Sequence, residues 1–417
     1  MQRDRWYALL ILTLVYTLNI ADRFVVSTLI EPIKLEFALS DTQVGLLTGA
    51  ALALFYVAAG IPLGTLADRV SRKRMIAVSL LAWSVLTAAS GMTRSFGQLL
   101  IARIFVGIGE AGGTPPSVAL LSDKFAPRAR GWAMSLYAIG AAAGAALGAS
   151  LGGRISDVYG WRAVLLVFGA MGIPVALLVV LTLREPQRGI LDEEPAALPA
   201  GLGDCIAFIR RNRPLMHVIA GATVLTFWGW GLVWWTPTFL LRSFGLSLGQ
   251  SGAYLGLIHA IGGTGVTLAT AAGMRLTARG PGLQARFVAW ATFLPTIPSF
   301  LAYCTSSTTL SIVALWFFVP MIYLYIGPTL ALAHNMVPAT MRSQTGAIIL
   351  FTTNIANLAL APLLIGSLSD MLAPYLVRPA DSLRWVLVAV SLTGFWAGWH
   401  FLRAAQLLDR AQSAQPG

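Results

Sequence analysis

Charged side chains are scarce in this chain of 417 residues. Asp, Glu, Lys and Arg make up 11% of it, whereas soluble domains carry about 25%. Only two cysteines are present, which excludes a small disulfide-stabilised scaffold. Apolar residues account for 57% of the chain, and the mean hydropathy is +0.73. This composition excludes intrinsic disorder and an ordinary cytosolic enzyme, and it predicts a protein that lies mostly in lipid.

Long apolar runs are what the sequence has instead. A bilayer core requires about 20 apolar residues per helix, and twelve stretches satisfy that requirement. They lie at approximately 6–30, 42–66, 75–93, 97–121, 131–152, 161–183, 214–240, 250–273, 286–304, 309–335, 342–368 and 383–404. No cleavable signal is evident, because the first run continues to Ile30. The sequence therefore predicts an all-α membrane protein with twelve transmembrane helices.

The basic residues are distributed unevenly between the loops. With the N-terminus placed inside, 20 Lys and Arg fall in inner segments and 7 in outer segments, as the positive-inside rule requires. We therefore expect a multi-pass protein of the inner or plasma membrane with both termini in the cytoplasm. The net charge of +12 is then explained by topology, and no nucleic-acid partner is expected.

The chain contains a weak internal repeat. Its longest polar gap, 184–213, separates six predicted helices from six more. Gly153–Asp157 ends the fifth predicted helix and resembles Gly366–Asp370 at the end of the eleventh. Such matches in the same order indicate duplication. The sequence thus predicts two pseudo-symmetric six-helix bundles, 1–183 and 214–417, joined by a cytoplasmic linker at 184–213, which is a known transporter design.

Four charged residues lie inside predicted helices: Asp22 and Arg23 in the first, Arg103 and Glu110 in the fourth. A charge at the bilayer centre costs about 2.5–3.5 kcal/mol, so they should face water or each other. At about 1.5 Å per residue, Asp22 and Arg103 lie at similar depth and could pair. A purely structural cluster is the alternative. We interpret Asp22 and Glu110 as proton-coupling groups, and Arg23, Arg103 and Asn19 as a substrate-headgroup site or charge switch.

The second half carries no acid in the core of its predicted helices. Its candidates for lining a cavity are instead aromatic, imidazole and amide side chains: Trp230, Tyr323, His259, Asn354 and Asn357. For the histidine, a hydrogen-bonded packing role is the alternative. Trp234 and Trp235 are expected in the aromatic belt at the membrane interface. A charged half facing an aromatic half favours a substrate with a charged headgroup and an apolar tail.

Several motifs carry a resemblance to a known family. Gly64–Lys73 (Gly-Thr-Leu-Ala-Asp-Arg-Val-Ser-Arg-Lys) resembles the signature loop of the major facilitator superfamily, with Ser71 in place of the usual Gly. Leu99–Ala111 resembles its fourth-helix motif. The glycines of the fifth helix resemble another, although Ala145 stands where drug antiporters carry proline.

Within that superfamily, Asn19–Arg23 together with Glu110 looks most like the spinster family of lysolipid and sphingolipid transporters. The same residues also resemble the anion:cation symporters of sugar acids. The resemblance implies a cytoplasmic gate in which Asp68 engages the start of the eleventh helix. The basic residues of that loop, Arg69, Arg72 and Lys73, belong to the gate or serve only as positive-inside anchors.

The expected function is a secondary active transporter that works by alternating access. We expect a proton-linked carrier of an amphipathic, lipid-like molecule; the alternative is a proton-coupled organic-anion symporter. No cofactor and no metal are expected, the proton gradient supplies energy, and the protein is expected to be a monomer among membrane lipids. A membrane-embedded enzyme would need a nucleophile–base pair or metal ligands at helical spacing, and the four histidines are far apart in the sequence.

Overall fold

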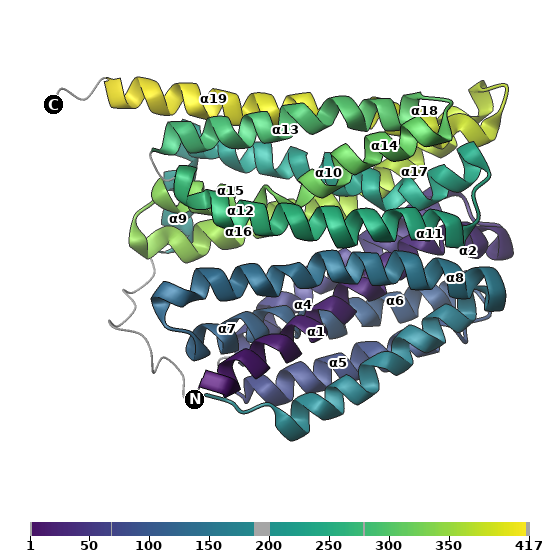
Figure 1. Cartoon of the computed structure of the whole chain (residues 1–417), viewed down its shortest axis with the longest axis horizontal. Helices are drawn as coiled ribbons and strands as arrows, with labels where there is room; N and C mark the ends of the chain where they lie inside the picture. Colours follow the sequence, from purple (N-terminus) through teal and green to yellow (C-terminus); the bar gives the residue numbers. More distant parts are fainter. Residues whose placement is uncertain (1, 68, 187–200, 278–279, 414–417) are drawn as a thin grey trace.

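The computed structural model describes residues 2–67, 69–186, 201–277 and 280–413. Within these ranges the chain is built of helices joined by short loops and contains no β-strand. Figure 1 shows the helices as two groups that lie side by side, α1–α8 in one and α10–α19 in the other. We call these groups the N-terminal bundle and the C-terminal bundle.

The N-terminal bundle consists of α1 (Gln2–Thr28), α2 (Ile30–Phe37), α3 (Asp41–Gly45), α4 (Ala51–Ala67), α5 (Arg72–Ser90), α6 (Phe96–Ala111), α7 (Thr114–Lys124) and α8 (Pro127–Thr182). A π-helical turn, Leu46–Ala50, joins α3 to α4, so both form one membrane-length helix. Helix α8 folds back at Gly160, whose φ of 79° lies in the left-handed region that glycine adopts without strain.

The C-terminal bundle consists of α10 (Arg213–Phe244), α11 (Leu248–Leu257), α12 (Thr264–Thr277), α13 (Pro281–Cys304), α14 (Thr308–Phe318), α15 (Ile326–Asn335), α16 (Arg342–Asn354), α17 (Ala361–Leu372), α18 (Ser382–Ser391) and α19 (Thr393–Ser413). Two π-helical turns, Ile258–Gly263 and Ile355–Leu360, join α11 to α12 and α16 to α17. Short 3-10 helices lie at Val319–Tyr323, Ala339–Met341, Ala373–Tyr375 and Pro379–Asp381.

The prediction of an all-helical membrane fold is confirmed, and the structure is consistent with the predicted twelve membrane helices. Ten stretches of the described residues are long and apolar enough to cross a membrane. One of them, Ala129–Thr182, is 54 residues long and holds two antiparallel passes because of the bend at Gly160. Helix α5, which packs between α6 and α8, supplies the remaining pass.

The linker is partly helical. Residues 202–211 form α9 (Leu202–Arg211), whose Cys205 is buried and lies 3.6 Å from the hydroxyl of Thr345 in α16. The division of the chain at residues 183 and 214 stays a prediction.

Glycines in α8 allow α1 to approach it closely. A Cβ atom at Gly144 would lie 2.4 Å from the carbonyl oxygen of Thr17, and one at Gly148 would lie 2.6 Å from that of Ala21. Neither position accepts a larger residue without moving a backbone. Small residues permit this packing in membranes, where no hydrophobic effect drives helices together. The close contact fixes the orientation of α1, which carries Asp22 and Arg23.

Helix α1 begins and α19 ends at the same end of the molecule, on the left in Figure 1. We call the opposite end, which holds α2, the bend at Gly160 and the turn between α17 and α18, the distal end. The two bundles contact each other extensively there, where α3 packs on α17 and α8 packs on α11. The functional side chains lie between this closed end and the termini.

Candidate functional site

The four intramembrane charges form two ion pairs between α1 and α6. Arg23 Nε donates to Glu110 Oε2 at 2.7 Å, and Arg103 Nη2 lies 2.9 Å from Asp22 Oδ2. The second contact is an ion pair without the alignment of a hydrogen bond. Similar depth predicted the pairing of Asp22 with Arg103, but not the second pair. The set of four is neutral, which makes its burial in the membrane tolerable.

Asp22 has a further partner in a third helix. Thr87 of α5 donates its hydroxyl to Asp22 Oδ1 at 2.6 Å. The carboxylate is 4% exposed, and the guanidinium of Arg103 is equally enclosed. This inner pair is therefore surrounded by protein on all sides, and it holds α1, α5 and α6 in one arrangement.

Several buried polar atoms of α1 and α6 lack a hydrogen-bond partner among the described residues: Asn19 Nδ2, Glu110 Oε1, and Nε and Nη1 of Arg103. A buried group without a partner costs about 1–3 kcal/mol. Unsatisfied atoms in a native structure need an explanation, such as a bound water, a proton or a ligand. The cluster thus has unused capacity to bind a small polar species.

Arg23 links the charge cluster to a cavity. Its side chain is 11% exposed, and its guanidinium carbon lies 4.7 Å from the centre of the Tyr56 ring in α4. The cavity, of about 220 Å³, is lined by Arg23 and by Tyr16, Ile20 and Phe24 of the same face of α1. Only Arg23 among the four charged residues lines it.

The opposite wall of the cavity comes from the C-terminal bundle and carries four aromatic side chains. It includes Trp230, Trp234, Tyr323, Tyr325, Asn354 and Asn357. Trp230 packs edge-on against Tyr323 with ring centres 5.5 Å apart, and Phe24 of α1 lies 6.1 Å from Trp230. The site is therefore shared by the two bundles, with a cation on one side and aromatic rings on the other.

His259 lies behind this wall. It is 1% exposed, its Nδ1 atom lies 2.9 Å from the hydroxyl of Tyr323, and its ring packs against Phe24. It does not line the cavity, which agrees with the packing alternative for this residue.

The expectation of an interface position for Trp234 and Trp235 is wrong. The two side chains are 5% and 0% exposed, and the Trp234 ring packs against Phe24 of α1 with ring centres 5.1 Å apart. Trp234 Nε1 donates to Asn357 Oδ1 at 3.2 Å in the cavity wall. Composition alone does not distinguish an interfacial tryptophan from one that faces the protein.

Sequence reasoning also missed Tyr16, Tyr56 and Tyr325. A signal for Tyr16 exists, because it precedes Arg23 by seven residues and so lies on the same face of α1. No comparable signal marks Tyr56, which reaches Arg23 from a different helix.

The predicted cytoplasmic gate is only partly described. Asp68 lies outside the described residues. Arg72 forms an ion pair with Asp123 of α7, and its backbone N–H donates to Glu185 Oε1 at 2.7 Å, just after α8. Arg69 is exposed and Lys73 is half-buried. The role of these residues in a gate stays a prediction.

Comparison with known proteins identifies relatives over the whole chain. The family described as "Major Facilitator Superfamily" matches residues 12–361. An "MFS-type efflux pump" of Mycolicibacterium smegmatis is 30% identical, covering 95% of this chain and 92% of its own. "Protein spinster homolog 3" of Danio rerio is 29% identical, covering 100% and 90%. A bacterial homologue of the human lysosomal transporter Spinster, crystallised "in inward-facing and unoccupied conformation", is 28% identical with a TM-score of 0.85 and covers 98% of each chain.

Proposed function

Because this chain belongs to the Major Facilitator Superfamily and is a membrane transporter, we propose that it moves an amphipathic, lipid-like substrate by proton-linked alternating access. The observation that carries the proposal is the position of Arg23, whose guanidinium bonds a fully buried acid and also lines a cavity with an aromatic far wall.

Arg23 can couple a substrate to a proton. An anionic headgroup in the cavity competes with Glu110 for the guanidinium, because both are acceptors for the same donors. When Arg23 turns to the substrate, Glu110 is left as an uncompensated charge in a water-excluded site. Uptake of a proton removes that charge. Substrate on Arg23 and a proton on Glu110 therefore favour each other, and Asp22, held by Arg103 and Thr87, is the second acid of the relay.

The chemistry of the far wall supports the choice of substrate. Trp230 and Tyr323 of this wall, together with Phe24 of α1 on the near side, offer apolar ring faces to an acyl chain, and burial of apolar area contributes about 25 cal/mol per Å². A cavity of about 220 Å³ is smaller than a usual ligand site. It therefore suits the headgroup and the first part of a tail, and the rest of the tail lies outside it.

A proton-coupled organic-anion symporter is the second candidate. It is favoured by Asn354 and Asn357, which place amide groups in the cavity wall of the C-terminal bundle. A sugar acid would use such hydrogen-bonding groups opposite Arg23, whereas an acyl chain would not.

Transport by purified protein in liposomes separates the two candidates. Labelled lysolipid and a labelled galactonate-type acid are supplied separately, with and without an imposed pH gradient. We expect gradient-dependent movement of the lysolipid and none of the sugar acid. Movement of the sugar acid alone would reject the lipid proposal in favour of the symporter.

The Glu110→Gln variant tests the coupling in the same assay. It should retain substrate binding but lose its response to the pH gradient, because glutamine cannot carry the proton. A pH response equal to that of the unmodified protein would exclude Glu110 as the proton carrier. Arg23→Gln is the matched variant: it should lose headgroup binding at every pH.

We further propose that the protein works as a monomer. We also propose that both termini lie in the cytoplasm, which the excess of Lys and Arg in the terminus-side loops supports. The distal end then faces outward. Accessibility of single cysteines to an impermeant reagent tests this orientation. A cysteine at the exposed Tyr375 of the distal end should react in intact cells, and one at Gln2 should not.

A further inference from the structure

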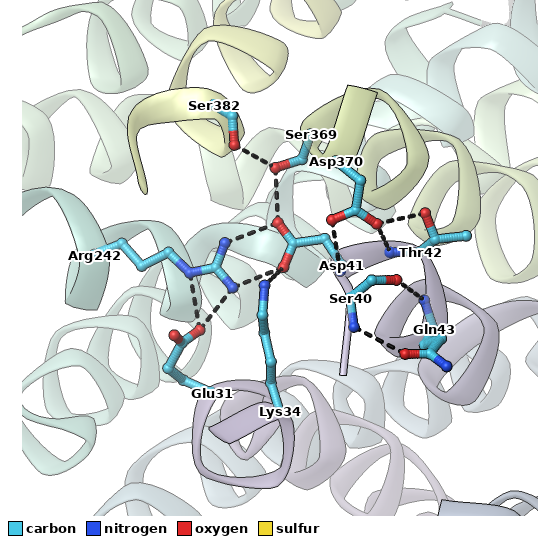
Figure 2. A network of polar contacts seen from close by, with 10 residues as sticks. All are labelled: Glu31, Lys34, Ser40, Asp41, Thr42, Gln43, Arg242, Ser369, Asp370 and Ser382. Atoms are coloured by element: carbon cyan, nitrogen blue, oxygen red, sulfur yellow. Dashed lines mark hydrogen bonds and ion pairs between the residues drawn. The ribbon is translucent and has the colours of Figure 1, made fainter. Parts of the chain in front are cut away.

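A carboxylate of the C-terminal bundle caps a helix of the N-terminal bundle at the distal end. Asp370 of α17 accepts the backbone N–H groups of Asp41 at 2.9 Å and Thr42 at 2.7 Å, and the hydroxyl of Thr42 at 2.6 Å (Figure 2). These donors are the first residues of α3, which continues through the π-helical turn into α4. The contact therefore joins one bundle to the start of a membrane-length helix in the other.

The reverse contact occurs on the other side of the interface. Asp157 of α8, in the N-terminal bundle, accepts the backbone N–H of Gly249 at 2.9 Å and the hydroxyl of Ser247 at 2.6 Å. Ser247 and Gly249 begin α11 in the C-terminal bundle. Each bundle thus supplies one carboxylate and receives one, and we call the two contacts the distal caps.

The distal caps are related by the internal repeat. Asp157 and Asp370 end the two matching segments, Gly153–Asp157 and Gly366–Asp370. The helices they cap also start alike, because Ser40 and Ser247 each form a capping box with a glutamine three residues later (Figure 2 shows the first). The aspartate and the helix start that it caps therefore both occur in each half of the repeat, although they meet only between the bundles.

A glycine one helical turn before each aspartate makes the contact possible. A Cβ atom at Gly366 would lie 2.2 Å from the carbonyl oxygen of Asp41, and one at Gly153 would lie 2.2 Å from that of Leu248. The backbones of the two bundles therefore touch at both caps. A separation of the bundles at this end must break the carboxylate bonds in the same movement.

The two caps differ in strength. Around the Asp370 cap, Arg242 of α10 binds the 2%-exposed Asp41 through both terminal nitrogens at 2.8 Å, and its Nε atom donates to Glu31 at 2.9 Å. Ser369 also donates to Asp41 at 2.7 Å (Figure 2). The Asp157 cap is solvent-exposed, and no ion pair between described residues encloses it. Charged bonds that are shielded from water are the stronger ones.

We propose that Asp157 and Asp370 form a two-fold lock that holds the distal end closed, with the Asp370 side contributing more than the Asp157 side. When the bundles rock to the conformation in which the distal end is open, α3 separates from α17 and α8 separates from α11. The freed N–H groups and carboxylates are then hydrated, so the lock opens and closes reversibly. The proposal concerns the conformational equilibrium alone and does not depend on the substrate or on proton coupling.

Distance measurements between spin labels test the lock. Labels are placed at Tyr159 and Tyr375, which are 75% and 85% exposed and belong to different bundles, in a protein whose Cys205 and Cys304 are replaced by serine. In Asp370→Ala we expect the ratio of open to closed distal end to rise about tenfold or more, which corresponds to about 1.4 kcal/mol. Asp157→Ala should give a smaller rise, and the double variant the largest.

Asp370→Asn is the conservative variant. Its amide oxygen still accepts one N–H, so the shift should lie between those of the unmodified protein and Asp370→Ala. If Asp370→Ala does not yield folded protein by thermal unfolding, Asp370→Asn and Asp157→Ala carry the test.

Glu36→Ala is the matched control. Glu36 is also a carboxylate of the distal end, and hydrogen bonds from Arg162 and Trp161 hold its pKa below the usual range. Those partners lie in its own bundle, at 2.5 and 2.7 Å, so its removal should leave the distances unchanged. Unchanged distances in Asp370→Ala or in the double variant, or an equal opening in Glu36→Ala, would overturn the proposal.

Discussion

The two members of the Arg23–Glu110 pair should respond differently to neutralisation. Glu110 is 0% exposed, whereas Arg23 is 11% exposed, lines the cavity and lies on the ring of Tyr56. In Glu110→Gln the amide oxygen still accepts from Arg23, and the unpaired guanidinium still reaches the cavity. In Arg23→Gln, by contrast, an ionised carboxylate is left in a site that water does not reach.

The magnitudes follow from this asymmetry. Removing one partner of a fully buried ion pair costs about 3–5 kcal/mol, which we expect for Arg23→Gln at neutral pH. Glu110→Gln replaces a charged hydrogen bond by a weaker one and should cost about 1–2 kcal/mol. In the double variant, Arg23→Gln with Glu110→Gln, both members of the pair are uncharged. Its stability should be close to that of Glu110→Gln, so the effects of the two single substitutions should not add.

Thermal unfolding in detergent measures the difference. In a protein whose exposed Cys304 is replaced by serine, a thiol-reactive fluorophore reports unfolding through Cys205, which is buried in the folded protein. Acidification should recover part of the stability of Arg23→Gln, because a proton on Glu110 removes the uncompensated charge. Glu110→Gln has no carboxylate at this position, so it should show no such recovery in acid. The reasoning is refuted if Arg23→Gln is as stable as Glu110→Gln at neutral pH, or if its unfolding temperature does not respond to acid.

Two further predictions concern packing and the cavity. Gly148→Val should prevent folding or lower stability by several kcal/mol, because its side chain would meet the backbone of α1. Gly60→Ala is the control, because a Cβ atom at Gly60 has nothing within 4 Å. Equal expression and equal unfolding temperatures of the two variants would contradict the prediction. Trp230→Ala should weaken binding of a long-chain substrate by about tenfold to a hundredfold, from the roughly 1.5–3 kcal/mol of a buried large side chain, and leave a small organic anion little affected. Asn354→Ala should do the reverse, and competition binding with both ligand types measures the difference.

Part of the site could be predicted because it depends on single helices. Asp22, Arg23, Arg103 and Glu110 are conspicuous since each breaks an apolar run, and the rise per residue places Asp22 and Arg103 at one depth. Depth does not give rotation about the helix axis. The bond from Arg23 to Glu110 depends on that rotation, which the close contact of α1 with the glycines of α8 imposes.

The distal caps also show what the sequence alone does not reveal. The repeat of Gly153–Asp157 at Gly366–Asp370 is visible in the sequence, where it indicates only duplication. Its physical meaning requires the partner helices, whose N-terminal N–H groups lie far away in the chain and come within hydrogen-bond distance only when the bundles meet. Trp234 likewise contacts Phe24 of α1 and Asn357 in the turn between α16 and α17, and no local pattern around residue 234 predicts those contacts.

The sequence by itself determined the membrane class, the twelve helices, their division into two related sets and the four charges that interrupt them. These features follow from hydropathy, length and spacing along the chain. They can be read locally, because polar groups are costly in lipid and therefore interrupt the apolar runs only rarely. The tertiary structure alone decided which charges pair, which of them reaches the cavity, and how the bundles join at the distal end. Those contacts depend on the angles and rotations at which helices pack, and these are set by residues distant in the sequence.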